Sequence, residues 1–500
     1  MLPPSMYLGG SAQSHPACPP VNTSRSSMAN QFEGAPAKKA NMAFRRFHAV
    51  KRLIAGIADR CCARCRSDTP VNAFQRRAMT GSNPGYSTVP VLVIGAGVVG
   101  LSTALYLQQA GMQVAVIDPL GPAGGASFGN AGMLSPDTAT PIAMPGMLRK
   151  VPGWLRDPLG PLAVRPSYFP HAMPWLLQWV KAGRLDRVLA VSDAMRALHR
   201  ETLDCWREML GDALYHDLIR PSGQVHVWEG NDASPTEAIE QQIRDRHGIR
   251  SQPLDADDLR QMFPGIARTI TRGLHLPGNG HTISPQRIVH SLGALFRAAG
   301  GDIIAEHAMK LIPRDGGGYM VMTNIANRDA DRVVVAAGAW SGQLLSPLGI
   351  RVPLETERGY HAMLFSPSVQ PRIPISSKTR AFFMTPMEDG LRVAGTVEIA
   401  GLDAPPDERR AKVLVDHARR LFPALETGDV RYWMGFRPST PDSLPILGPV
   451  GGRPGLYLAF GHGHFGMSGG PPSGRLLARL ITGQAPGIDP APYAAQRFAR

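Results

Sequence analysis

Cysteine is scarce in this chain and is concentrated near its start. Five cysteines occur in 500 residues, and all but Cys205 precede residue 66. The chain after residue 66 has a single thiol and therefore cannot form an internal disulfide. This excludes a fold that depends on disulfides in that part of the chain and favours a reducing compartment. Cys62 and Cys65 have C-x-x-C spacing without a second pair, and the alternating His462 and His464 lack a carboxylate or thiol at ligand spacing. We therefore expect no metal site.

Acidic residues are scarce in the first 88 residues. Twelve Lys or Arg stand there against three acids, so this segment carries +9 of the formal net charge of +14. The rest of the chain carries only +5, so we expect no nucleic-acid partner for it. Composition predicts that residues 1–88 are a disordered basic extension. A transit peptide is an alternative, and we favour an overextended gene start, because Met79 lies just before the first predicted strand.

Charged residues are absent between Arg77 and Asp118. A hydropathy window would mark this stretch as a membrane span, but three glycines interrupt it. The period of its apolar residues also changes from that of a strand to that of a helix, which predicts a buried parallel strand followed by a packed helix.

The sequence VLVIGAGVVG, residues 91–100, has the spacing of a dinucleotide-binding turn. Gly95 permits the tight turn, Gly97 lets the backbone approach a pyrophosphate, and Gly100 lets helix and strand pack closely. The pyrophosphate would lie at the N-terminus of a helix that runs to about Ala110. Asp118 ends the next strand, where an acid should accept a ribose hydroxyl. The order of these features predicts a dinucleotide site.

The fingerprint alone does not separate NAD from FAD. Two later stretches, DRVVVAAGAWSGQL and GLYLAFGHGHFGMS, again run from a predicted strand into glycine-rich chain. Between them and the fingerprint stands the small-residue loop GPAGGASFGNAGMLSP, which suits a long flat ligand better than a core. A ligand held along so much of its length favours FAD.

The motifs VLVIGAGVVG, GASFGNAG, VVVAAGAWS, ERGYH, GFRPSTPDSLPILG and GHGHFGMS stand in this order in the chain. The series resembles the FAD-dependent D-amino acid oxidase and dehydrogenase superfamily, most closely its D-amino acid dehydrogenase-like branch, over about residues 89–498. The resemblance implies an α/β protein, α+β overall. In it, a Rossmann-like, discontinuous FAD-binding domain carries an inserted, mainly antiparallel β-sheet substrate domain. The implied segments are the extension 1–88, FAD-binding 89–150, 275–348 and 435–500, and substrate 151–274 and 349–434.

Local patterns agree with this arrangement. AFFMTPMEDGLRVAGTVEIAG predicts two strands around an Asp389-Gly390 turn, followed by a helix from about Pro406 to Leu421. SPQRIVHSLGALFRAAGG predicts a helix capped by Ser284. GMSGGPPSGR departs from the family pattern, which more often has larger apolar residues and one proline, so the start of the last helix is left open.

The resemblance also implies the residues around the flavin. Beside the fingerprint, the 124–132 loop should follow the pyrophosphate and flavin, and the 461–467 loop should meet the pyrimidine end, where amides that open a helix stabilise negative charge. Cys205 lies far from every flavin motif, so cysteine attachment is not expected, while attachment through His462 stays open. The expected cofactor-binding residues are Gly95, Gly97, Val98, Val99, Gly100, Asp118, Ser127, Asn130, Ala131, Gly132, Gly338, Gly461, His464, Gly466 and Met467.

Three residues are expected to act on the substrate. Arg437 matches the family position for an arginine that binds the substrate carboxylate, which suits its planar two-point hydrogen bonding. The alternative is a structural ion pair with Asp442. Tyr360 would lie over the flavin with its hydroxyl available, or be a core tyrosine. His361 would accept the ammonium proton.

The implied reaction is hydride transfer from the α-carbon of an amino acid, most simply a D-amino acid, to flavin N5. The imino acid formed hydrolyses to a 2-oxo acid and ammonia, and oxygen or a quinone-linked chain reoxidises the flavin. Alternatives are enzymes for N-methylated or cyclic amino acids (sarcosine, glycine, hydroxyproline) or for 2-hydroxy acids. An RNA-acting flavoprotein and a non-catalytic flavin-bound assembly factor are alternatives of another class.

The stretch HAMPWLLQWVKAGRLDRVL has tryptophan and leucine on one helical face and basic residues near its end. An interfacial helix has this pattern, and so does a helix that packs its apolar stripe inward. We expect a cytoplasmic protein, with peripheral contact with the inner face of the membrane as the alternative.

Overall fold

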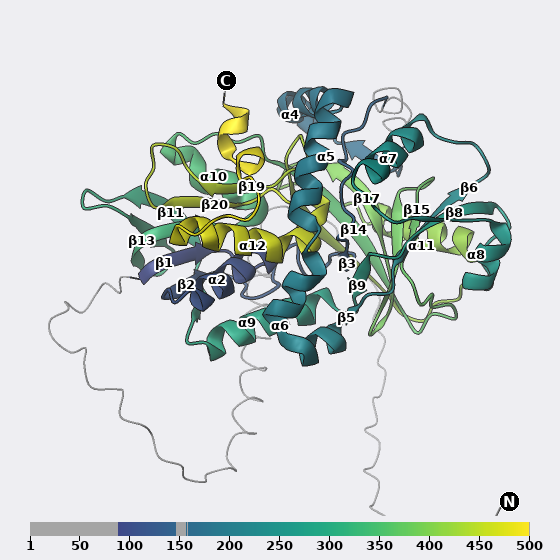
Figure 1. Ribbon diagram of the computed structural model, residues 1–500, viewed down its shortest axis with the longest axis horizontal. Coiled ribbons are helices and arrows are strands. Elements are labelled where there is room, and N and C mark those ends of the chain that lie inside the picture. Colours follow the sequence, from purple (N-terminus) through teal and green to yellow (C-terminus); the bar gives the residue numbers. More distant parts are fainter. Residues whose placement is uncertain (1–88, 147–156, 158, 500) are drawn as a thin grey trace, which may run out of the picture. The chain divides into compact units, whose positions relative to one another are not determined.

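The uncharged stretch near residue 90 folds as the β–α–β unit that its glycines predict. The computed structural model describes residues 89–146, 157 and 159–499, so the predicted extension, with Cys62, Cys65 and Met79, lies outside the described residues. β1 (Val89–Ile94) leads into α2 (Val98–Gln109), and β2 (Val114–Ile117) returns parallel to β1. The described residues belong to one compact unit, Ser82–Arg500 (Figure 1).

The first sheet has eight strands in the order β10-β2-β1-β13-β12-β11, with β20 also paired to β13 and β19 to β20. β10, β2, β1, β13 and β20 pair in parallel. β12 pairs antiparallel with β13, β11 with β12, and β19 with β20. The further strands are β10 (Asp302–Ile304), β11 (Ala308–Pro313), β12 (Tyr319–Thr323), β13 (Asn327–Val335), β19 (Ile446–Pro449) and β20 (Leu456–Phe460).

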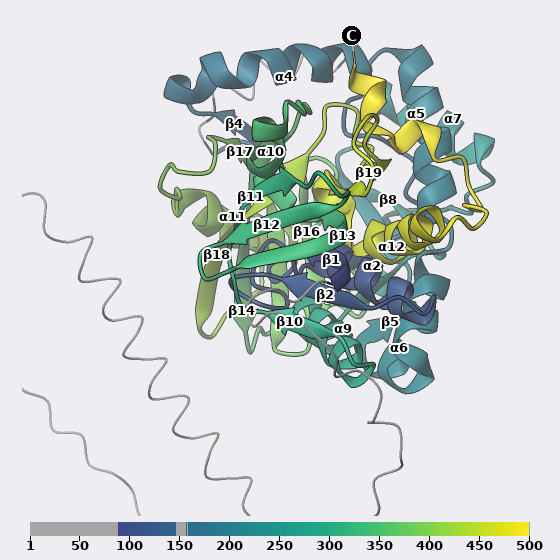
Figure 2. The ribbon, with the colours of Figure 1, turned by 90° about the vertical axis from the view of Figure 1, so that its left-hand side faces the viewer.

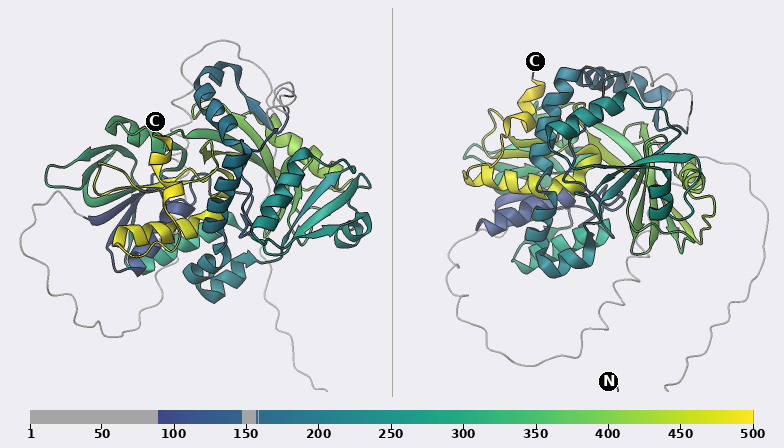
Figure 3. Two further views of the ribbon diagram at one scale, coloured as in Figure 1. Left: turned by 45° about the horizontal axis from the view of Figure 1, so that its top comes forward. Right: turned by 45° about the vertical axis from the view of Figure 1, so that its right-hand side comes forward.

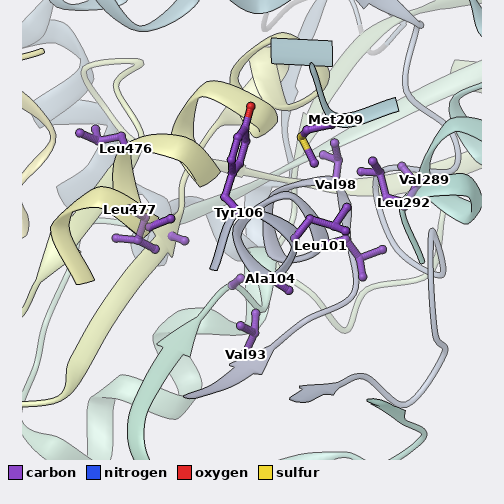
Figure 4. Packing of buried hydrophobic residues seen from close by; sticks show 14 of the residues in the cluster. Val93, Val98, Leu101, Ala104, Tyr106, Met209, Val289, Leu292, Leu476 and Leu477 are labelled. Carbon is purple, nitrogen blue, oxygen red and sulfur yellow. The ribbon is translucent and has the colours of Figure 1, made fainter. Parts of the chain in front are cut away.

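Alternate residues of β1 enter different cores, as the period of two along a strand requires. Val91 and Val93 pack under a helical layer, whereas Leu92 and Ile94 face β11, β12 and α10 (Ser341–Leu345). The helical layer contains α2, α9 (Pro285–Ala298) and α12 (Gly466–Thr482), and Figure 4 shows how their side chains meet. These helices lie together on one side of the strands in Figure 2. The Ser284 cap of α9 is confirmed, because its hydroxyl accepts the Arg287 N–H at 3.3 Å.

The second sheet has nine strands in the order β18-β14-β17-β16-β15-β6-β8-β7, with β4 paired to β17. It is antiparallel except at the β15–β6 and β17–β4 pairs. Its strands are β4 (Leu162–Val164), β6 (Gln224–Glu229), β7 (Gln252–Leu254), β8 (Ile270–Leu276), β14 (Glu355–Phe365), β15 (Ile375–Ser377), β16 (Phe382–Met387), β17 (Gly390–Ile399) and β18 (Val430–Ser439).

The predicted hairpin is the β16–β17 pair, in which Met387 and Gly390 are partners. The predicted helix after it is α11 (Arg409–Leu421), which starts three residues later than about Pro406 and covers one face of this sheet. The opposite face turns toward the cavity described below. A mixed α/β fold with a Rossmann-like sheet and a mainly antiparallel second sheet is therefore confirmed.

The segment 159–218 contains three α-helices, α4 (Phe169–Ala182), α5 (Leu185–His199) and α6 (Thr202–Leu218). α5 and α6 share a core with α2 and α12, although the predicted boundaries assign them to the substrate domain. Figure 3 shows the ribbon of these helices in two further views. The six-segment division itself stays a prediction. Other elements are β3 (Met133–Leu134), β5 (Ile219–Arg220) and β9 (Gly280–Thr282), which form a third sheet, and the helices α7 (Pro235–Arg246) and α8 (Ala256–Met262).

The tryptophan stripe of α4 (Phe169–Ala182) packs inward. Trp175 and Trp179 are buried in a core with Ile399, and the Trp175 indole donates to the Ser439 carbonyl at 3.2 Å. Leu177 remains exposed. In the described ranges no helix has the length and hydropathy needed to cross a bilayer.

Candidate active site

A cavity of about 1370 Å³ runs from the glycine fingerprint to the face of the second sheet. Ligand pockets commonly hold roughly 300–1,000 Å³, so this one has room for an extended cofactor together with a small substrate. Its walls come from the β1–α2 turn, the 124–135 loop, the end of β13, the start of α12 and strands β14, β17 and β18.

Close backbone contacts within the chain require glycine in the fingerprint. Gly95 has φ +117°, and a Cβ there would lie 2.3 Å from the Ala336 carbonyl oxygen at the end of β13. A Cβ at Gly100 would lie 1.9 Å from the carbonyl oxygen of Gly95. Gly97 borders the cavity, and its position leaves the N-terminus of α2 open toward it. A phosphate at this terminus would meet backbone N–H groups and the positive end of the helix dipole.

Asp118 stands beside this turn at the end of β2. Its Oδ2 accepts the Ala96 N–H at 2.8 Å, and its Oδ1 accepts N–H groups of Leu120 and Gly121. Burial raises the pKa of Asp118, and these three donors oppose that shift. The Ser127 hydroxyl accepts the Val98 N–H at 3.1 Å, which ties the small-residue loop to the start of α2. Asp118 and Ser127 thus shape the turn and border the cavity where the adenosine and pyrophosphate half of a dinucleotide is predicted.

The second sheet holds the 124–132 loop in place. The Nδ1–H of His361 donates to the Gly129 carbonyl at 3.0 Å, and its ring stacks on Trp433. Arg392 donates to the Asn130 carbonyl at 2.7 Å. Burial lowers the pKa of His361 to about 3, and its side chain lies behind the loop and outside the cavity wall. This corrects the prediction that His361 accepts a substrate proton.

Tyr360 requires a second correction. It borders the cavity, but its hydroxyl donates to Glu398 Oε2 at 2.5 Å and accepts the Asp407 N–H. Its ring belongs to the core between the sheet and α11. The cause is the alternation along β14, because Glu357, Gly359 and His361 share one face and Tyr360 belongs to the other. These contacts agree with the alternative that Tyr360 is a core tyrosine.

Arg437 lies in the cavity, and its guanidinium covers Gly359. β14 and β18 are antiparallel neighbours, with Glu357 opposite Arg437 and Gly359 opposite Gly435. A Cβ at Gly359 would lie 2.1 Å from Arg437 Cζ, so this glycine provides the space that the guanidinium occupies. Arg437 Nη1 donates to the Thr396 carbonyl at 3.3 Å.

The ion-pair alternative for Arg437 does not hold. Asp442 pairs with Arg497 at 2.8 Å, and in the part of the chain that the structure describes no carboxylate lies within salt-bridge distance of Arg437. Burial lowers the pKa of Arg437, and the carboxylate of Glu357 opposes that shift. Within the described residues the guanidinium donates only to the Thr396 carbonyl, so its other N–H groups remain for a ligand in the cavity.

Glu357 is a site residue that the sequence did not reveal. Its carboxylate is buried and accepts the Nε2–H of His464 at 2.6 Å. Burial would raise the pKa of Glu357, but the contact with His464 and the charge of Arg437 lower it overall. Its position two residues before Gly359 on the same strand face was the available signal. Arg392 and Thr396 gave no comparable signal, because their roles depend on neighbouring strands.

The last helix begins at Gly466, so the start left open by GMSGGPPSGR is resolved, and both prolines lie inside the helix. His462 borders the cavity, but its Nε2 lies 2.9 Å from Ser473 Oγ, and burial lowers its pKa to about 3. Cys205 is buried on α6, outside the cavity wall. No cluster of metal-ligating side chains occurs among the described residues.

The structure brings most of the predicted site residues together. Gly100, Gly132, Gly461 and His361 lie behind the cavity wall. The residues that line it are Gly95, Gly97, Val98, Val99, Asp118, Ser127, Asn130, Ala131, Gly338, Tyr360, Arg437, His464, Gly466 and Met467.

Comparisons with known proteins agree with this geometry. A family model described as DAO, FAD dependent oxidoreductase, matches residues 90–480. A D-amino-acid oxidase of Bradyrhizobium diazoefficiens is 37% identical over 415 residues, which cover 82% of this chain and 98% of that protein. A D-amino acid dehydrogenase of Vibrio vulnificus is 32% identical, covering 79% and 96%.

Solved structures share the fold. The chain is similar to a glycine oxidase from Geobacillus kaustophilus with a TM-score of 0.62 at 22% identity, covering 83% of this chain and all of that one. It is also similar to an L-proline dehydrogenase from P. horikoshii with a TM-score of 0.64 at 17% identity, covering 83% and 98%. The chain belongs to the family of FAD-dependent oxidoreductases, which confirms the expected cofactor and enzyme class.

Proposed function

We propose that this protein oxidises an amino acid, with D-amino acids as the preferred class, to an imino acid that water converts to a 2-oxo acid and ammonia. One observation carries the proposal. A guanidinium that forms no salt bridge within the described residues, Arg437, lies over Gly359 in the same cavity as the dinucleotide fingerprint. Such a group binds a carboxylate through two parallel hydrogen bonds. The preference for D-amino acids rests on the relatives named D-amino-acid oxidase and D-amino acid dehydrogenase.

The side chains around Arg437 would orient the substrate. The Thr396 carbonyl and the Gly359 surface fix the guanidinium plane, and Glu357 holds the His464 ring beside it. When bound, FAD supplies the chemistry by accepting the hydride of the α-carbon. The protein needs to present that C–H bond correctly, and two-point binding of the carboxylate restricts its direction. No strong side-chain base is required for this role.

A substrate panel without oxygen tests the proposal. The purified protein is mixed with D- and L-amino acids, sarcosine, glycine, hydroxyproline and lactate, and the flavin absorbance is followed. Bleaching by D-amino acids supports the proposal, whereas bleaching only by N-methylated or cyclic amino acids, or by lactate, replaces it with the corresponding alternative. Adding oxygen or a soluble quinone after reduction then separates an oxidase from a dehydrogenase.

A further inference from the structure

The first two turns of α12 lack two of their own hydrogen-bond donors. In an α-helix the N–H of each residue donates to the carbonyl four residues earlier. Proline has no N–H, and its ring displaces that carbonyl. Pro471 and Pro472 lie inside α12, so the carbonyls of Met467 and Ser468 lose their helical partners. Both of these residues border the cavity.

Two side chains of α6 reach these same carbonyls. The indole Nε1–H of Trp206 donates to the Met467 carbonyl at 3.0 Å. The Thr202 hydroxyl lies 3.1 Å from the Ser468 carbonyl and 2.6 Å from the His199 carbonyl, so its one proton is shared. Trp206 and Thr202 are both fully buried. Water therefore cannot supply either bond, and an unpaired buried carbonyl is costly.

The other side of α12 leaves no room for adjustment. A Cβ at Gly470 would lie 2.9 Å from Val98, and one at Gly474 would lie 2.7 Å from the backbone of α2. The start of α12 is thus fixed between α2, which contacts it closely, and α6, which supplies its missing donors. Residues Gly466–Ser468 are the part of this helix that borders the cavity.

We propose that Trp206 is a positioning residue for the flavin. Its indole N–H takes the place of the backbone donor that Pro471 lacks, and it thereby holds the opening amides of α12 at the cavity wall. Thr202 assists in the same way opposite Pro472. The inference depends on FAD binding and not on the identity of the substrate.

The chain itself offers a matched rescue, because replacing Pro471 by alanine restores the missing N–H. The full-length variants are Trp206→Phe, Pro471→Ala, Pro472→Ala and the two doubles with Trp206→Phe. We expect Trp206→Phe to raise the FAD dissociation constant about tenfold, the cost of one unpaired buried carbonyl. Pro471→Ala should remove that loss, since the new backbone N–H at position 471 then serves Met467. Pro472→Ala should not, because its N–H would serve Ser468. The packing lost with the indole is common to both doubles and cancels in this comparison.

The midpoint reduction potential of the bound flavin is a second measurement. It should become more negative in Trp206→Phe, since misplaced amides stabilise negative charge less, and should return in the Pro471→Ala double. Three results overturn the proposal. The first is an unchanged potential in Trp206→Phe, and the second is a rescue by Pro472→Ala equal to that by Pro471→Ala. The third is a double-mutant coupling between positions 206 and 471 that changes the FAD dissociation constant by less than twofold. If Trp206→Phe is insoluble, recovery of soluble flavoprotein by Pro471→Ala alone supports it, and recovery by neither overturns it.

Discussion

The adenosine and pyrophosphate end of the cavity is centred on one short stretch of chain, whereas the carboxylate end is assembled from elements far apart in sequence. The β1–α2–β2 unit spans residues 89–117 and presents mainly backbone groups. The carboxylate end combines β14, β17, β18 and the short 3-10 helix η5 (Gly463–Phe465) and presents side chains. Local motifs thus predict where FAD lies, and strand pairing determines which side chains line the rest of the cavity. The variants below test this contrast, beginning with the largest expected effect.

Gly95→Ala should abolish FAD binding. The added methyl group would lie 2.3 Å from the Ala336 carbonyl at φ +117°, so the turn must move. We expect a colourless protein without activity, measured by visible absorbance. Gly342→Ala on α10 is the control, since its added methyl group meets nothing within 4 Å and should leave a yellow enzyme. A Gly95→Ala protein with wild-type flavin content would contradict the prediction.

Arg437→Ala should abolish turnover while leaving the protein yellow. Removing the charged partner of the carboxylate should lower kcat/KM about 10³-fold, or about 4 kcal/mol of transition-state binding. Anaerobic stopped-flow reduction by the amino acid that bleaches the wild type measures this effect. Arg437→Lys should recover part of the rate, because it keeps the charge and loses the two-point geometry. Unchanged reduction kinetics in Arg437→Ala would remove Arg437 from the site.

Gly359→Ala should affect the same end less strongly. The new Cβ would lie 2.1 Å from Arg437 Cζ, so the guanidinium must shift while its charge remains. A displacement of this size should lower kcat/KM about 10²-fold. FAD affinity should stay at the wild-type value, because Gly359 lies on the substrate sheet. A variant that loses FAD instead would show that the two ends are not separable.

His361→Gln should change pH dependence more than activity. Burial lowers the pKa of His361 from 6.5 to about 3 in the folded chain. Between these values the unfolded chain binds a proton that the folded chain does not, so stability falls as pH falls through this range. In the variant the free energy of unfolding should change with pH less steeply, by about 1.4 kcal/mol per pH unit, which corresponds to one proton. Urea unfolding at pH 7, 6 and 5 measures it, with exposed His290→Gln as the control. A slope equal to that of the wild type would contradict the buried neutral state.

Tyr360 shows why the carboxylate end resists prediction. ERGYH marks a strand, but a strand shows alternate residues to opposite faces, and one position of error exchanges the faces. The actual face carries Glu357, Gly359 and His361, and it is selected by the pairing of β14 with β17 and β18. Trp206 is hidden for a similar reason, because only the packing of α6 on α12 brings its indole to Met467.

The sequence by itself determined the β–α–β unit, the FAD cradle and the family, because a tight turn, a helix N-terminus and a terminal acid act within about thirty residues of one another. The resemblance to the family also implied Arg437 for the substrate carboxylate, and this role stays a prediction. Only the tertiary structure decided that Arg437 lies over Gly359 with no salt bridge within the described residues. It also decided that Tyr360 bonds to Glu398 and His361 to the Gly129 carbonyl, and that α6 completes α12. These outcomes depend on the register and packing of segments separated by tens to hundreds of residues, which no local pattern specifies.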